Sequence, residues 1–162
     1  MTLTLAGTGL PAATRELILA PQTIKARFAG HDVSMLGFNG GVPGPDIRFR
    51  QGDTAQIRLD NGLNDGALVH WHGLRVPNRM DGVNVLTQDV VIPGERFDYR
   101  FDLADAGTYW YHSHSGYQEQ TGIYGAIIID PIEPEPFSFD REFVMLLSDW
   151  SDEDPHQIYT KL

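Results

Sequence analysis

The dominant pattern along the chain is a series of short segments in which apolar and polar residues alternate, separated by Gly, Pro, Asn and Asp. Alternation with period two is typical of strands that bury one face, because successive side chains point to opposite sides. The pattern predicts roughly eight strands and little helix, which favours an all-β sandwich or barrel. Besides the short segment before residue 70, the predicted strands lie in residues 16–28, 33–38, 54–59, 97–103, 108–112, 123–129 and 143–147.

The composition changes near the C-terminal end. The chain has 162 residues, which fits one domain of ordinary size. From Asp130 onward acidic residues greatly outnumber the two basic ones, and Pro131, Pro134 and Pro136 punctuate the stretch. We therefore interpret residues 1–130 as the β domain and residues 131–162 as an acidic, proline-containing extension with a last strand at 143–147, leading toward a further domain. A solvated acidic tail is an equally good interpretation of the same residues.

Composition excludes several classes of function. The net charge of −10 argues against binding to nucleic acids or to an anionic membrane surface. No run approaches about 20 apolar residues, so no membrane-spanning helix is expected. Residues 1–11 lack the basic segment and apolar run of a signal peptide. The absence of cysteine excludes disulfides, thiolate zinc sites, iron–sulfur clusters, a cysteine nucleophile and a type 1 blue-copper site within this chain.

Four of the six histidines form two His-x-His pairs, His70 with His72 and His112 with His114. Each pair follows an apolar β segment. On a strand, residues i and i+2 project from one face roughly 6.5–7 Å apart, which is too wide for easy chelation of one ion and suits two neighbouring ions. Neutral imidazole is a ligand for copper, zinc, iron and nickel.

The identical spacing of the two pairs predicts metal binding, although a single such pair in a β protein is more often structural. A hydrolytic zinc site, with three ligands and a carboxylate base, is compatible with four histidines. The doubled i, i+2 spacing favours a multinuclear site instead. His31 and His156 are isolated in the sequence, and we interpret both as surface residues.

Four ordered segments resemble the first cupredoxin domain of the multicopper oxidases. They are Val69-His70-Trp71-His72-Gly73-Leu74, Asn78-Arg79-Met80-Asp81-Gly82, Gly107-Thr108-Tyr109-Trp110-Tyr111-His112-Ser113-His114-Ser115 and Gly122-Ile123-Tyr124-Gly125-Ala126-Ile127-Ile128-Ile129. Residues 116–121 are most similar to the bacterial copper-resistance branch and to bacterial laccases. The resemblance runs from about Leu17 to Asp154. It implies a cupredoxin-like (plastocyanin-like) Greek-key β-sandwich or barrel, with residues 1–130 as domain 1.

The resemblance also implies individual roles. His70 matches a ligand of the type 2 copper, and His72, His112 and His114 match ligands of the type 3 copper pair. Asp81 matches the carboxylate that assists proton delivery during oxygen reduction, whereas taken alone it is an ordinary turn residue before a glycine.

Several neighbouring residues have simpler interpretations. Trp71 and Ser113 should point away from the ligands and pack or hydrogen-bond. Glu119 is either an acid next to the metal ligands or a solvated loop residue, and the second interpretation is favoured. Four aromatic residues are interpreted as core or loop packing in preference to redox relays; they are Tyr109, Trp110, Tyr111 and Tyr117.

The function implied by the resemblance is that of a laccase-like, copper-dependent oxidoreductase, which reduces dioxygen to water while phenolic or aromatic substrates or Cu(I) are oxidised. The trinuclear cluster of this family takes four histidines from each of two domains. This chain has four in matching positions and no cysteine. We therefore expect a half-site for the type 2 and type 3 coppers, no type 1 site, and no activity of the chain alone.

The implied partners are the remaining cupredoxin domains of the same oxidase and dioxygen, with self-association through the open half-site face as a further expectation. A periplasmic or secreted location is implied by the family.

The alternative function is that of a free-standing copper-binding module without catalysis. The first domain of a copper nitrite reductase is disfavoured, because that domain normally carries the type 1 cysteine. Asp89 and Val90 depart from a Cys-Pro common among relatives, which removes one disulfide partner and no copper ligand.

Overall fold

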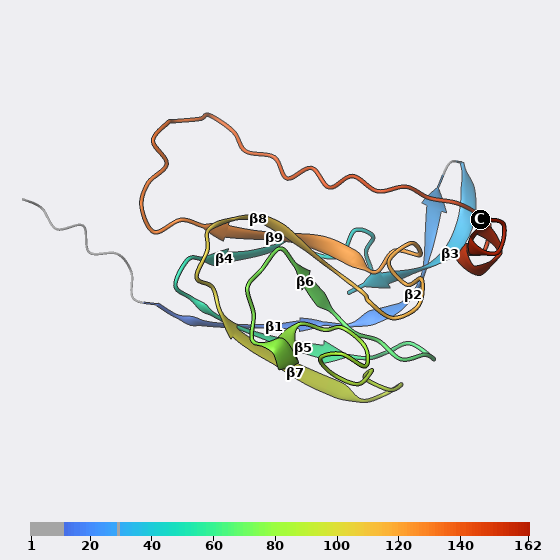
Figure 1. Cartoon of the computed structure of the whole chain (residues 1–162). Coiled ribbons are helices and arrows are strands. Elements are labelled where there is room, and N and C mark those ends of the chain that lie inside the picture. The colour runs from blue at the N-terminus through green and yellow to red at the C-terminus, as the bar shows by residue number, and fades with distance from the viewer. Residues whose placement is uncertain (1–11, 29) are drawn as a thin grey trace, which may run out of the picture.

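The computed structural model describes residues 12–28 and 30–162, and its two larger β-sheets face each other (Figure 1). One sheet has the order β1-β5-β7, formed by Thr14–Leu19, Thr54–Asp60 and Arg96–Asp102. The other has the order β4-β9-β8-β6, formed by Ile47–Arg50, Tyr124–Asp130, Gly107–His112 and His70–His72. A hairpin of β2 (Pro21–Phe28) and β3 (His31–Phe38) lies at one end. The predicted all-β class is confirmed; residues 1–11, considered for a signal peptide, lie outside the described part.

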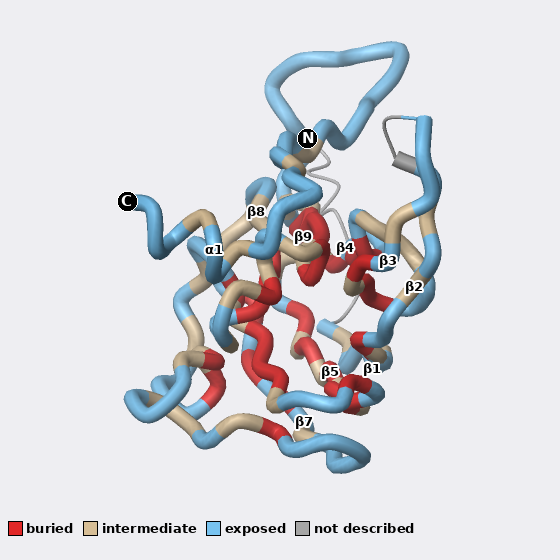
Figure 2. The backbone as a smooth tube through the Cα atoms, turned by 90° about the vertical axis from the view of Figure 1, so that its right-hand side faces the viewer, coloured by how far each residue is buried: buried red, intermediate tan, exposed pale blue. Residues whose placement is uncertain are grey.

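The core lies between the two sheets, where the tube in Figure 2 is mostly buried. Along β5 the predicted alternation is seen directly, because every second side chain is buried. Tyr99 on β7 lies opposite Ile57 in the antiparallel register. From the other sheet Trp71 and Tyr111 reach inward, and the Trp71 ring lies 5.1 Å from that of Tyr99. The two strands that carry the histidine pairs are therefore anchored by large apolar side chains on their inner faces.

Two features of the first sixty residues differ from the sequence prediction. The predicted strand over residues 16–28 is two strands, because the chain changes sheets at Ala20: β1 pairs in parallel with β5, whereas β2 pairs with β3. The Asn39 side chain accepts a hydrogen bond from the Ala20 N–H and donates one to the Ile18 carbonyl, which stabilises the crossing. The short strand β4 was not predicted; it pairs in parallel with β9.

The predicted last strand at 143–147 is wrong, because residues 141–150 have no regular secondary structure. A strand needs a free sheet edge for its backbone groups. This segment instead lines a cavity of about 300 Å³ together with Trp110 and Ala126, which belong to the inner strands β8 and β9. The extension ends in a short helix, α1 (Pro155–Tyr159), whose first turn is capped by the Asp154 carboxylate. Within residues 12–28 and 30–162, no helix has the length and apolarity to cross a membrane.

Candidate metal centre

The pairing of β6 with β8 brings the two histidine pairs together. In this antiparallel register His70 lies opposite His112, Trp71 opposite Tyr111, and His72 opposite Trp110. Because side chains alternate along a strand, the buried Trp71 and Tyr111 share the core face and the three histidines share the other. The expected orientations of Trp71 and Ser113 are confirmed: Trp71 is fully buried, and Ser113 donates a hydrogen bond to the buried Gln118 side chain.

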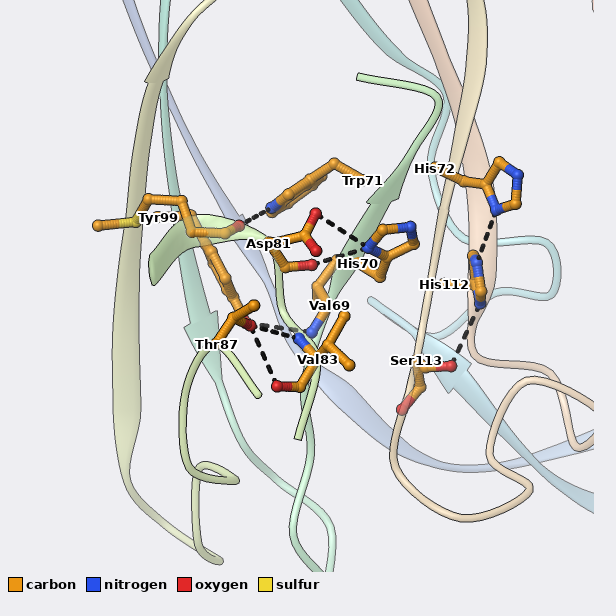
Figure 3. Close-up of polar contacts among 11 residues, drawn as sticks. Val69, His70, Trp71, His72, Asp81, Val83, Thr87, Tyr99, His112 and Ser113 are labelled. Atoms are coloured by element: carbon orange, nitrogen blue, oxygen red, sulfur yellow. Dashed lines mark hydrogen bonds and ion pairs between the residues drawn. The ribbon is translucent and has the colours of Figure 1, made fainter. Parts of the chain in front are cut away.

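Ring nitrogens of His70, His72 and His112 all lie within 4.8 Å of one another. One close approach joins the two strands, with His72 Nδ1 3.3 Å from His112 Nε2 (Figure 3). His114 follows the end of β8, and its ring centroid lies 4.5 Å from that of His70 and 4.9 Å from that of His112. All four predicted histidines therefore gather at one place, and contacts between the pairs are as short as contacts within them.

Asp81 determines which nitrogen His70 presents. The Asp81 carbonyl oxygen lies 2.8 Å from His70 Nδ1, and a carboxylate oxygen of the same residue lies 3.4 Å from that atom (Figure 3). A backbone carbonyl can only accept, so Nδ1 carries the proton and Nε2 keeps the lone pair. Asp81 follows the short 3₁₀ helix η1 (Asn78–Met80), whose Met80 carbonyl accepts a hydrogen bond from the Trp71 indole.

The electrostatic environment favours the neutral form of two imidazoles of the cluster, His112 and His114. Burial, with the neighbouring His114 and His70, lowers the pKa of His112 to about 4. Burial and His70 also lower the pKa of His114. Neutral imidazole is the form that binds a metal ion. The donor set of the site, four imidazoles of which two are favoured in the neutral form, thus fits copper.

Two residues near the site make contacts with the histidines that the sequence did not reveal. Trp110 packs, as predicted, and its ring stacks on His112 at 4.0 Å and lies 4.9 Å from the His72 ring. Glu119 is not merely a solvated loop residue, because its Oε2 lies 2.7 Å from His112 Nδ1. Burial raises the pKa of this carboxyl group. Gly116 and Gly122 flank the loop that carries Glu119, and they indicate in the sequence that the chain can turn back toward His112 there.

The two isolated histidines lie outside the cluster and are exposed, as predicted. His31 Nε2 lies 3.0 Å from an Asp152 carboxylate oxygen. The His156 ring packs edge-on against Tyr117 at 4.6 Å. Neither joins the group of metal-capable nitrogens found in the described part of the chain.

Comparison with known proteins agrees with this geometry. A family model described as multicopper oxidase matches residues 21–134. The chain belongs to the multicopper oxidase family. Members of this family are copper-dependent oxidoreductases, among them laccases and ascorbate oxidases. The chain carries the family's first cupredoxin domain.

Relatives of this multicopper oxidase domain are much longer proteins. Copper resistance protein A of Escherichia coli is 53% identical over 124 residues, which are 76% of this chain and 20% of that protein. A copper resistance protein A homologue of Pseudomonas syringae is 47% identical over 138 residues, 85% of this chain and 23% of that protein. A laccase variant from B. aclada superimposes with a TM-score of 0.86 at 34% identity, covering 95% of this chain and 29% of the laccase. The chain thus spans about a quarter of the length of these relatives.

Proposed function

We propose that the chain supplies half of the type 2/type 3 trinuclear copper site of a laccase-like oxidase that reduces dioxygen to water while phenolic or aromatic substrates or Cu(I) are oxidised. The observation that carries the proposal is the convergence of four imidazoles from two strands, three of them with nitrogens within 4.8 Å. In this proposal His70 is a ligand of the type 2 copper. The ligands of the type 3 pair are His72, His112 and His114.

Copper bound at such a site supplies the one-electron chemistry that oxygen reduction requires. The contribution of this chain is to hold neutral imidazoles in place on a rigid sheet, so that little reorganisation accompanies binding. Asp81 is assigned to proton delivery. Its carboxylate lies 3.4 Å from His70 Nδ1 and its side chain is 33% exposed, so it contacts both the site and solvent.

Titration of the isolated chain with Cu(II) tests the half-site directly. The wild-type chain should bind Cu(II), and His72→Ala and His112→Ala should each weaken binding by at least about tenfold, because each removes a ligand. His156→Ala is the matched control, since that histidine is exposed and lies outside the cluster. No blue absorption band at about 600 nm should form, because there is no cysteine. Equal affinities for His112→Ala and His156→Ala would refute the site.

The competing function is a free-standing copper-binding module. Mass spectrometry of the polypeptide from its native source separates the two. A longer chain with a His-Cys-His segment supports the oxidase, whereas a native chain that ends near Leu162 supports the module. Oxidase turnover by the isolated chain would contradict the half-site proposal.

We also propose that the half-site face meets the remaining cupredoxin domains of the oxidase, and that it promotes self-association when they are absent. Size-exclusion chromatography with and without copper tests this, and a monomer under both conditions counts against it. A periplasmic or secreted location is part of the same proposal, and cell fractionation of the native protein tests it.

A further inference from the structure

We propose that Glu119 is a positioning residue that holds His112 in the tautomer and ring orientation in which Nε2 faces the metal. The inference rests on the proposed copper site and adds a residue to it. Its basis is a contact that joins the loop after the second histidine pair to the buried imidazole, with Glu119 Oε2 2.7 Å from His112 Nδ1.

The partners of Nδ1 determine the tautomer of His112. The second oxygen near this atom is the Ser113 carbonyl, at 3.2 Å. A backbone carbonyl and an ionised carboxylate only accept hydrogen bonds, so Nδ1 carries the proton and Nε2 keeps its lone pair. That lone pair is directed at the cluster, since Nε2 lies 3.3 Å from His72 Nδ1. Of the two oxygens near Nδ1, the carboxylate oxygen is the closer and belongs to an acidic group, so it attracts the Nδ1 proton more strongly than the neutral carbonyl does.

Burial and ring stacking restrict the orientation of the His112 imidazole. His112 is 4% exposed, and the Trp110 ring stacks on it with an interplanar angle of 13°. Stacking sets the plane of the imidazole but not which nitrogen faces the cluster, because a ring flip preserves the plane. The contact with Glu119 distinguishes the two flipped orientations, since only one places Nδ1 against the carboxylate.

The loop that carries Glu119 is itself firmly held. The Glu119 carbonyl accepts a hydrogen bond from the Gly122 N–H, which closes a turn. The preceding Gln118 is buried, accepts from Ser113 Oγ and donates to the Gly66 carbonyl just before the first pair. The carboxylate is therefore delivered by a fixed turn. His70 has the same arrangement with a different acceptor, because its Nδ1 faces the backbone carbonyl of Asp81.

A carboxylate behind a metal-binding histidine commonly contributes 10–100-fold in metal affinity. We therefore expect Glu119→Ala to weaken Cu(II) binding by about 10–100-fold. Glu119→Gln should lose less, because its amide oxygen still accepts from Nδ1. Asp149→Asn is the matched control. Asp149 lines the same cavity as Glu119 and acts on it electrostatically, but among the described residues it forms no hydrogen bond or ion pair with a histidine. The substitution should change the affinity by no more than about twofold, because a charge without direct contact is screened by solvent.

The decisive second measurement is the ¹⁵N spectrum of the histidine rings in the metal-free chain. The wild-type His112 should be in the Nδ1–H form, Glu119→Ala should shift it toward the other tautomer, and Glu119→Gln should restore it. An unchanged spectrum in Glu119→Ala overturns the proposal, even if affinity falls, because charge alone would then be responsible. An equal loss in Asp149→Asn also overturns it. A wild-type chain that binds no Cu(II) would refute the half-site instead, and the spectrum would still decide the role of Glu119.

Discussion

The first histidine pair lies entirely within a strand, whereas the second begins on the last residue of a strand and ends in a loop. Between the first two histidines stands Trp71, which is fully buried in the core. Between the second two stands Ser113, which is buried in a network of hydrogen bonds with Gln118 and Ser115. Equal spacing thus places both pairs on one face, while the intervening residue determines whether apolar packing or polar contacts anchor them.

The largest effect should come from removing the apolar anchor. Trp71→Ala should lower the free energy of unfolding by about 3–5 kcal/mol, because it leaves a large cavity in the core. The comparison variant is Trp110→Ala. Trp110 lies on β8, which pairs with β6, and its partly exposed ring is on the face of the sheet that carries the histidines. The substitution should cost about 1 kcal/mol and act mainly on copper affinity through the lost stacking on His112. Denaturant unfolding measures both, and equal losses would contradict the division into two faces.

Gly82 tests how closely the first pair depends on backbone packing. Its φ of 72° disfavours any other residue, and a Cβ there would collide with the Val69 carbonyl just before His70. Gly82→Ala should cost about 3 kcal/mol, from left-handed backbone strain and from that collision. Gly94 is the control, with a φ of 78° and open space around it, so Gly94→Ala should cost only about 1 kcal/mol. A similar loss in the two variants would show that the contact with Val69 is unimportant.

Tyr99, which contacts the backbone just before the first pair, should make the free energy of unfolding depend on pH in the alkaline range. Its hydroxyl oxygen accepts the Val69 N–H at 3.1 Å, and burial raises its pKa to about 12. In the unfolded chain the phenol ionises near pH 10. The contribution of the protonated phenol to the free energy of unfolding is therefore complete below pH 10. It is lost as pH rises from there to about 12, by about 3 kcal/mol in total.

Unfolding of the wild-type chain and of Tyr99→Phe, measured at pH 9 and pH 11.5, tests this dependence. The advantage of the wild-type chain should shrink at the higher pH, because phenylalanine does not ionise. A constant difference would show that Tyr99 titrates normally in the fold.

The smallest loss of stability should come from removing the hydrogen bonds of Ser113, which anchor the second pair. Ser113→Ala removes the hydrogen bond to Gln118 and leaves the Ser115 N–H without its acceptor, which should cost about 1–2 kcal/mol. Ser148→Ala should cost nothing measurable, because the exposed Ser148 hydroxyl donates to the backbone carbonyl of the next residue at the surface. If both serines proved neutral in thermal unfolding, the network would have no role in anchoring the pair.

Local pattern was enough to predict most of the fold but not its sheet order. Alternation in β5 and β7 is visible in the sequence because each strand buries one face. The error at 143–147 arose because strand formation also needs a free edge, which depends on how distant segments assemble. The break at Ala20 has the same origin, since the side chain that stabilises it comes from Asn39, nineteen residues away.

For the site, too, the sequence predicted the local features but not those that depend on how distant segments assemble. Spacing within each pair indicates a shared face, so the sequence identified all four histidines that the structure brings together. The opposition of His70 and His112 depends on strand register, which spacing does not reveal. Glu119 was misjudged because its position depends on the turn closed by Gly122 rather than on any repeat in the sequence.

The register of β6 and β8 has a consequence for when the protein can acquire copper. His72 and His112 are 40 residues apart in the chain and meet only across paired strands. An unfolded or newly made chain offers each pair separately, and a slip of one residue would turn the first pair into the core. In the proposed site the full set of ligands therefore exists only in the paired sheet, so we expect copper loading to follow folding. Copper bound there would favour the folded state by mass action, and unfolding of the sheet would release the ion.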